Sequence, residues 1–135
     1  AMKTKTIRQS VTFKTSPDKL YALLFDSKKL TQMHGTPTQM TRRAGGKFTV
    51  FGGYCHGYNV ELIENTCIKQ AWHFQEEGWP EDYFSTCRFV LGPVANGTKL
   101  VFTHKGVPEH TYEAIKAGWL TFYWDPIHAY LAGMR

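Results

Sequence analysis

The chain has 135 residues, of which 20% are charged and 15% are aromatic, so it is a folded protein and not a disordered tail. Its net charge of +5 comes from basic residues spread along the chain, with local clusters at Lys28 and Lys29 and at Arg42, Arg43 and Lys47. No recognised nucleic-acid motif accompanies this charge, so we expect either a solvated surface or a face for an acidic partner, and no nucleic acid.

Cysteine usage indicates the compartment. The cysteines are odd in number and show no CxxC spacing, which favours a reducing environment over a disulfide framework. They are Cys55, Cys67 and Cys87. No signal peptide or membrane-spanning run is recognised, so the expected location is the cytoplasm. Ala1 and Met2 are interpreted as a tag remnant. Residues 3–135 are interpreted as one domain, long enough to bury about two thirds of the surface that the unfolded chain would expose.

The first elements expected along the chain are a strand and two short helices. Polar and apolar residues alternate from Thr6 to Lys14, as in a half-buried strand. Ser16 can then cap a helix whose first position suits Pro17, and its buried face is formed by Leu20, Leu23, Leu24 and Phe25. A second helix is predicted from Ser27 to Met33.

A run of strands separated by turn residues follows and predicts an antiparallel meander. It begins with Thr38 to Arg43. The other predicted strands are Lys47 to Phe51, Tyr54 to Ile63, Cys67 to Gln75, Tyr83 to Leu91 and Leu100 to Lys105. The last stretch, Glu109 to Met134, repeats apolar residues every three or four positions and predicts a long amphipathic helix, which Pro126 should kink or briefly break.

This order of elements predicts an α+β fold. About six to seven antiparallel strands form one curved sheet, two short helices follow the first strand, and the long final helix lies in the concavity of the sheet.

Seven short motifs occur one after another along this layout. They are Gly45-Gly46-Lys47-Phe48, Phe51-Gly52-Gly53, Trp72-His73-Phe74, Trp79-Pro80-Glu81, Gly97-Thr98-Lys99-Leu100, Gly106-Val107-Pro108, and Gly118-Trp119 through Tyr123-Trp124-Asp125-Pro126-Ile127. From about Thr6 to Leu131 the chain therefore resembles the C-terminal domain of the activator of the heat shock protein 90 (Hsp90) ATPase, a member of the START-like, helix-grip superfamily.

The resemblance implies a non-enzymatic, co-chaperone-like module that binds Hsp90 and stimulates its ATPase. Eukaryotic members carry a separate N-terminal domain that supplies much of the chaperone contact, so this chain is expected to be a stand-alone version of the C-terminal module. The basic residues expected to contact the acidic chaperone are Lys28, Lys29, Arg42, Arg43 and Lys47.

The alternative is a carrier or sensor of a small hydrophobic ligand between sheet and final helix. A connected void of about 300 Å³ or more would favour this alternative. We expect any such cavity to be small and mostly apolar, with a tyrosine hydroxyl or a nitrogen of His56 or His104 as its orienting polar group. Its expected lining is Tyr58, Trp72, Phe74, Phe89, Phe102, His104, Trp119 and Tyr123.

Catalysis, a metal and a cofactor are not expected. The six histidines make no HExxH or zinc-finger spacing, and no GxSxG nucleophile elbow occurs. An enzyme of the cyclase type is a third alternative, which would require His56 or His104 to face a cleft. Alternation places Trp72, Phe89, Leu100 and Phe102 on the covered face of the sheet and predicts that His73, on the other face, is solvated. Trp79 is expected to fold back onto the sheet.

Overall fold

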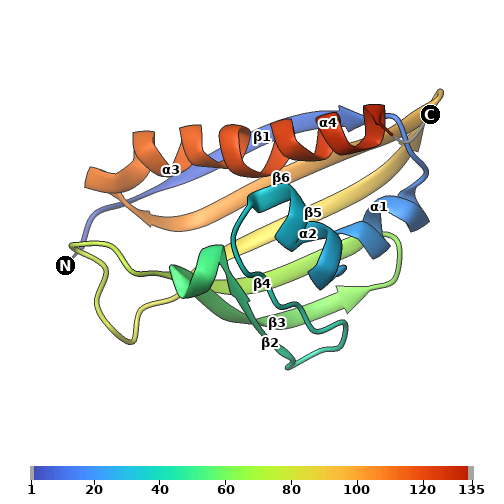
Figure 1. The fold of residues 1–135 in the computed structure, drawn as a ribbon. Helices are drawn as coiled ribbons and strands as arrows, with labels where there is room; N and C mark the ends of the chain where they lie inside the picture. The colour runs from blue at the N-terminus through green and yellow to red at the C-terminus, as the bar shows by residue number, and fades with distance from the viewer. Residues whose placement is uncertain (1, 134–135) are drawn as a thin grey trace.

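A computed structural model describes residues 2–133 as one curved antiparallel sheet with helices packed on its concave side (Figure 1). The six strands lie in the order β1-β6-β5-β4-β3-β2, so the last five form the predicted meander and the first joins its far edge. The predicted α+β helix-grip fold is confirmed. The strands are β1 (Thr4–Phe13), β2 (Lys47–Val50), β3 (Cys55–Ile63), β4 (Cys67–Phe74), β5 (Ser85–Val94) and β6 (Gly97–Pro108).

Two short α-helices, a 3₁₀ turn after β2 (η1, Phe51–Gly53) and one long helix complete the fold. The short helices follow β1, and the long one crosses the sheet from end to end (Figure 1). We call residues 109–132 the C-terminal helix. Its segments are η2 (Glu109–Thr111), α3 (Tyr112–Trp119), η3 (Leu120–Trp124) and α4 (Asp125–Ala132), and the short helices are α1 (Pro17–Leu23) and α2 (Ser27–His34). Met134, the predicted end of the long helix, lies outside the described residues.

No break occurs at Pro126, where the sequence predicted a kink or a brief break. The C-terminal helix continues through this residue because η3, the segment just before it, is a π turn. A proline in a regular α-helix removes one amide donor, and its ring clashes with the carbonyl four residues earlier, here that of Phe122. A π turn is one residue wider, which relieves that crowding and lets the helix span the sheet.

The strand predicted from Thr38 to Arg43 is also absent. Only Gln39 pairs with the sheet, through an isolated bridge to Thr49. Side chains of α2 hold this segment instead: the Thr38 amide donates to the hydroxyl of Thr31 over 3.0 Å, and the Met40 amide donates to that of Ser27 over 2.8 Å. The segment therefore runs beside α2 and along the edge strand β2, but it does not add a strand to the sheet.

The core lies between the concave face of the sheet and the helices. Trp72, Phe89, Leu100 and Phe102 are all buried there as the alternation predicted, although β4 is buried on both of its faces. Leu20 and Leu23 of α1 are buried as predicted, and so are Leu24 and Phe25 directly after it. Within residues 2–133, no helix combines the length and the apolar character needed to cross a membrane.

Candidate functional site

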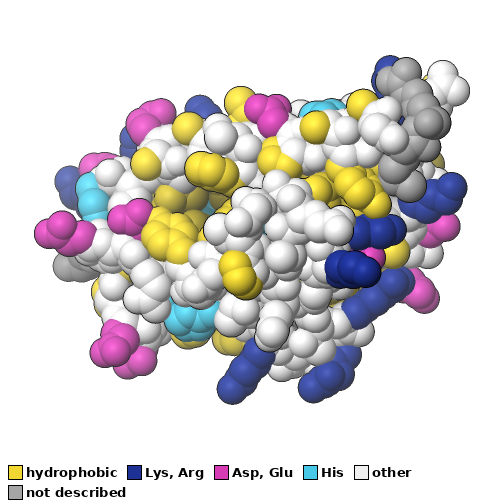
Figure 2. Space-filling view, viewed as in Figure 1, with side chains coloured by type: hydrophobic (Ala, Val, Ile, Leu, Met, Phe, Trp, Pro, Cys, Tyr) yellow, Lys and Arg dark blue, Asp and Glu magenta, His cyan; other side chains and the backbone are white. Residues whose placement is uncertain are grey.

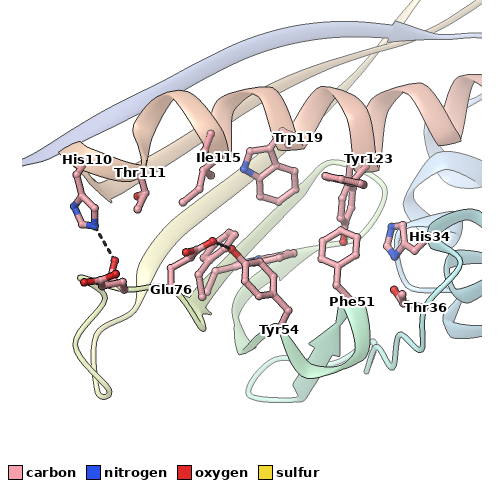
Figure 3. A pocket seen from close by; sticks show the side chains of 16 residues that line it. His34, Thr36, Phe51, Tyr54, Glu76, His110, Thr111, Ile115, Trp119 and Tyr123 are labelled. Carbon is pink, nitrogen blue, oxygen red and sulfur yellow. Dashed lines mark hydrogen bonds between the residues drawn. The ribbon is translucent and has the colours of Figure 1, made fainter.

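The sheet and the C-terminal helix do not close on each other along their whole length, and a cleft of about 710 Å³ remains between them. Figure 2 shows the hollow, lined by hydrophobic side chains, below the C-terminal helix, and Figure 3 shows its walls. The volume exceeds the 300 Å³ named above and contradicts the expectation of a small cavity. Its lining is His34, Thr36, Phe51, Tyr54, Trp72, Phe74, Glu76, Glu77, His110, Thr111, Ala114, Ile115, Gly118, Trp119, Phe122 and Tyr123.

The roof of the cleft is one face of the C-terminal helix. Ile115, Trp119 and Tyr123 are buried at spacings of four residues, so they point from the same face of the helix toward the sheet. Ala114 and Gly118, also four residues apart, add almost no side-chain volume to the lining. These two small residues leave the room that larger ones would fill.

The floor of the cleft is β4. Trp72 is buried and packs edge-on against Trp119, with ring centroids 5.0 Å apart, while Phe74 lies beside it at 5.8 Å. The indole N–H of Trp72 donates to the side-chain oxygen of Gln70 over 2.9 Å, and the Gln70 amide donates to Asn59 over 2.9 Å. The floor is therefore fixed by hydrogen bonds as well as by packing.

One end of the cleft is closed by the loop that follows β4. His110 donates from Nε2 to the carbonyl oxygen of Glu77 over 2.7 Å, which joins this loop to the start of the C-terminal helix (Figure 3). Gly78, at φ +87°, makes the contact possible, because a Cβ there would lie 2.2 Å from the His110 ring. Trp79 folds back as predicted: it is buried and packs against Phe74 at 4.8 Å.

Polar groups face the open side of the cleft. The hydroxyl of Tyr54 donates to the carboxylate of Glu76 (Figure 3), and burial, followed by this carboxylate, raises the pKa of Tyr54. At the other end, burial lowers the pKa of His34 to about 4, so its imidazole is neutral at pH 7. Its Nδ1 lies 3.0 Å from the hydroxyl of Thr38.

The predicted cavity residues are only partly brought together. Trp72, Phe74, Trp119 and Tyr123 line the cleft. Phe89 and Phe102 lie behind Trp119 in the packed core, with Phe102 only 4.4 Å from its ring. Tyr58 was assigned to the wrong side of the sheet: it is 42% exposed on the convex face, where it packs against Phe84.

His104 is in the core and not in the cleft. It is completely buried, and both ring nitrogens have partners: the Trp119 indole donates to Nδ1 over 3.1 Å, and Nε2 lies 2.7 Å from Ser85 Oγ. The Ser85 hydroxyl donates to the carbonyl of Trp72 over 3.2 Å, so it accepts the Nε2 proton. This histidine therefore cannot take a proton from the serine, nor serve as the orienting group of a ligand.

The other two strand histidines lie together on the convex face. His56 stands opposite His73 in the register of β3 and β4, with ring centroids 4.9 Å apart, so it does not face inward. The prediction that His73 is solvated is wrong. Its Nδ1 lies 2.8 Å from the Tyr83 carbonyl and the rings of Trp79 and Phe84 cover it, which leaves 3% exposed.

The predicted partner-binding residues lie around α2 and the segment that follows it. Figure 2 shows Lys and Arg side chains gathered around the two short helices and along the adjoining lower edge. The guanidinium of Arg42 lies 4.8 Å from the ring centre of Tyr21 and 3.5 Å from the carboxylate of Glu64. Lys28, Arg43 and Lys47 are exposed, and Lys29 is half-buried with its ammonium 3.9 Å from Asp26.

The sequence did not reveal most of the cleft's rim. Phe51 and Tyr54 come from the turn after β2, Glu76 from the loop after β4, and His34 from the end of α2. Nothing in a local pattern relates these three segments in space. One usable signal was Ala114 with Gly118, since two small residues on an aromatic helical face indicate missing volume. Among residues 2–133, His, Cys, Asp and Glu side chains form no group of three that could hold a metal ion.

Comparison with known proteins places the chain in a family. The family model described as "Activator of Hsp90 ATPase homolog 1-like protein" matches residues 14–132. The chain belongs to this family. The resemblance inferred from the sequence motifs is thus confirmed.

Members of the family differ in length. The mouse activator of 90 kDa heat shock protein ATPase homolog 2 is 32% identical over 120 residues, which cover 88% of this chain and 35% of that protein. The human homolog 1 is 28% identical over 116 residues, or 86% of this chain and 34% of that protein. This chain therefore spans about a third of these curated relatives.

A solved structure of similar length matches this chain almost from end to end. An HSP90 activator from Plasmodium falciparum is 26% identical, with a TM-score of 0.85, and the match covers 98% of this chain and 97% of that one.

Proposed function

We propose that this protein binds an Hsp90-class chaperone and stimulates its ATPase. The observation that carries the proposal is the match to the P. falciparum HSP90 activator. The match covers 97% of that chain, so the solved activator is about as long as this protein. Stimulation requires that the protein bind the ATP-hydrolysing conformation of the chaperone more tightly than the others, since a partner shifts an equilibrium only by such a preference.

The proposed role is non-enzymatic and the proposed location is the cytoplasm. The contact surface we propose is the basic set Lys28, Lys29, Arg42, Arg43 and Lys47. Its charge would favour an acidic chaperone surface and would speed encounter at low salt. The buried Ser85 and His104 pair offers no activated nucleophile, in keeping with a binding role.

The decisive experiment is the steady-state ATPase rate of the source organism's Hsp90 with and without stoichiometric protein, at low and moderate salt. We expect acceleration that falls as salt rises and that is lost in the double variant R42E/R43E. The matched control is K99E/K105E, two exposed lysines of β6 outside the set, which should keep the acceleration. Equal loss in both variants would contradict the proposed surface, and no acceleration by the wild type would contradict the function.

A second candidate function rests on the cleft. At about 710 Å³ with mainly aromatic and aliphatic walls, it has the size and character of small-molecule sites. We therefore also propose that the protein binds a small, largely hydrophobic ligand between β4 and the C-terminal helix. Titration with apolar probes, followed through the fluorescence of Trp72 and Trp119, tests this candidate, because both rings line the cleft.

A further inference from the structure

The charge of the cleft is opposite to that of the protein. The whole chain has 16 Lys and Arg against 11 Asp and Glu, yet the cleft lining contains Glu76 and Glu77 and no lysine or arginine. His34, also in the lining, is neutral at pH 7 because burial lowers its pKa to about 4. The acidic side chains of the lining thus have no basic Lys or Arg counterpart within it.

These carboxylates are free to bind a cation. The two salt bridges found in residues 2–133 join Lys29 to Asp26 and Arg42 to Glu64, so no lysine or arginine of that part neutralises Glu76 or Glu77. The partner of Glu76 is the neutral hydroxyl of Tyr54, which orients the carboxylate at the open side of the cleft (Figure 3). The aromatic rings of Tyr54, Trp72 and Phe74 also line the cleft.

We propose that the cleft binds small amphipathic organic cations, with the apolar body under the C-terminal helix and an ammonium group beside Glu76 and Glu77. The inference rests on the second candidate function and specifies the class of its ligand. An ammonium group gains from the carboxylates and from the aromatic rings, whose faces attract cations. A fatty-acid carboxylate would add a third negative charge to the same rim and is disfavoured.

The test compares three probes that share one apolar body: decyltrimethylammonium, decanol and decanoate. Each is titrated below its micelle concentration at pH 7.5 by calorimetry and by tryptophan fluorescence. We expect the cation to bind roughly tenfold or more tightly than decanoate, with decanol between them, and the preference to shrink as salt rises. The double variant E76Q/E77Q should bind the three probes with similar Kd. The control E113Q removes an exposed carboxylate of the C-terminal helix outside the lining and should keep the preference.

The outcomes distinguish a failure of the proposed cation preference from a failure of ligand binding itself. If no probe binds the folded protein, the ligand-binding function itself fails. If all three bind equally, or decanoate binds best, ligand binding stands and the preference for cations is overturned. Loss of the preference in E113Q as large as in E76Q/E77Q would also overturn it, because the effect would then come from overall charge. If no probe binds but Hsp90 changes the fluorescence of the cleft tryptophans, the cleft is assigned to a segment of the chaperone instead.

Discussion

The indole N–H of Trp119 donates to Nδ1 of His104 over 3.1 Å, and this bond joins the C-terminal helix to β6 across the core. It also selects the tautomer: with Nδ1 as acceptor, the proton sits on Nε2 and points to the hydroxyl of Ser85 on β5. The helix is thus fixed in rotation about its own axis, because turning it would leave a buried indole donor and a buried imidazole acceptor without partners. This rotation decides which residues form the roof of the cleft.

The buried imidazole predicts a loss of stability in mild acid. Burial lowers the pKa of His104 to about 3, whereas in the unfolded chain it titrates near 6.5. Between these values the unfolded state binds more protons than the folded state, so stability is present above pH 6.5 and falls as pH drops toward 3. From pH 7 to pH 5 this residue should lower the free energy of unfolding by roughly 2 kcal/mol.

Urea denaturation of the wild type and of His104→Gln at both pH values measures this contribution. A glutamine side chain can accept from Trp119 and donate to Ser85 without titrating, so the variant should lose less stability on acidification. The remaining drop is assigned to His34 and His56, whose pKa values are also lowered by burial. His128→Gln, at an exposed position of α4, should behave as the wild type does. Parallel pH profiles for wild type and His104→Gln would refute the assignment.

Gly57 is predicted to be irreplaceable. It stands opposite Trp72 in the register of β3 and β4, and a Cβ there would lie 1.8 Å from the carbonyl oxygen of Ala71 and 2.9 Å from the Phe48 ring. The first contact is with backbone and cannot be relieved by a rotamer change, so Gly57→Ala should destabilise by at least about 3 kcal/mol. Gly92→Ala, a strand glycine with no atom within 4 Å of its Cβ, should stay within about 0.5 kcal/mol in thermal unfolding. Similar losses in the two variants would contradict the steric explanation.

Local patterns predicted the elements because each of them follows a single period. Alternation located the inward faces of β4 to β6, and steps of three and four located the buried face of the C-terminal helix. The two failures arose where side chains or neighbouring turns changed the backbone. Thr31 and Ser27 hold the segment after α2 away from the sheet, and the π turn before Pro126 keeps the helix intact.

The candidate site was less predictable because it depends on distances between elements. Alternation shows that His104 and Phe102 point inward but not that Trp119 packs directly onto them and excludes them from the cleft. It also cannot show that the rings of Phe84 and Trp79 cover His73 on the convex face. Glu76 reaches the cleft only because the loop after β4 turns back toward the C-terminal helix. Such proximity is set by the whole fold and not by any one segment.

Asn59 is predicted to hold the segment that carries Arg42 and Arg43. Its buried side-chain amide donates to the carbonyl oxygens of Thr41 and Arg43, and its oxygen accepts from Gln70. Asn59→Ala leaves these buried groups without partners and should cost roughly 2 to 4 kcal/mol. Hydrogen exchange should quicken over residues 41–46, while Gln75→Ala, at an exposed position, should change neither quantity. Unchanged exchange in Asn59→Ala would contradict this role of the Asn59 side chain.

The two candidate functions can be separated at Gly118. A Cβ at this position meets only the Phe122 ring, at 3.8 Å, and the residue lies within α3, so a larger side chain enters the cleft without disturbing the backbone. Gly118→Ala should stabilise the helix by about 0.5 to 1 kcal/mol and change probe binding little.

Gly118→Leu should fill part of the cleft and weaken binding of the apolar probes roughly tenfold or more, because the leucine occupies volume that the probe's apolar body needs. Stimulation of the Hsp90 ATPase should be unchanged in the same variant if the basic set around α2 makes the contact, since Gly118 lies on the C-terminal helix, apart from that set. Measuring both activities on one preparation decides the relation between them. A parallel loss of probe binding and ATPase stimulation would mean that the chaperone uses the cleft itself, and the basic set would then steer encounter without forming the main contact.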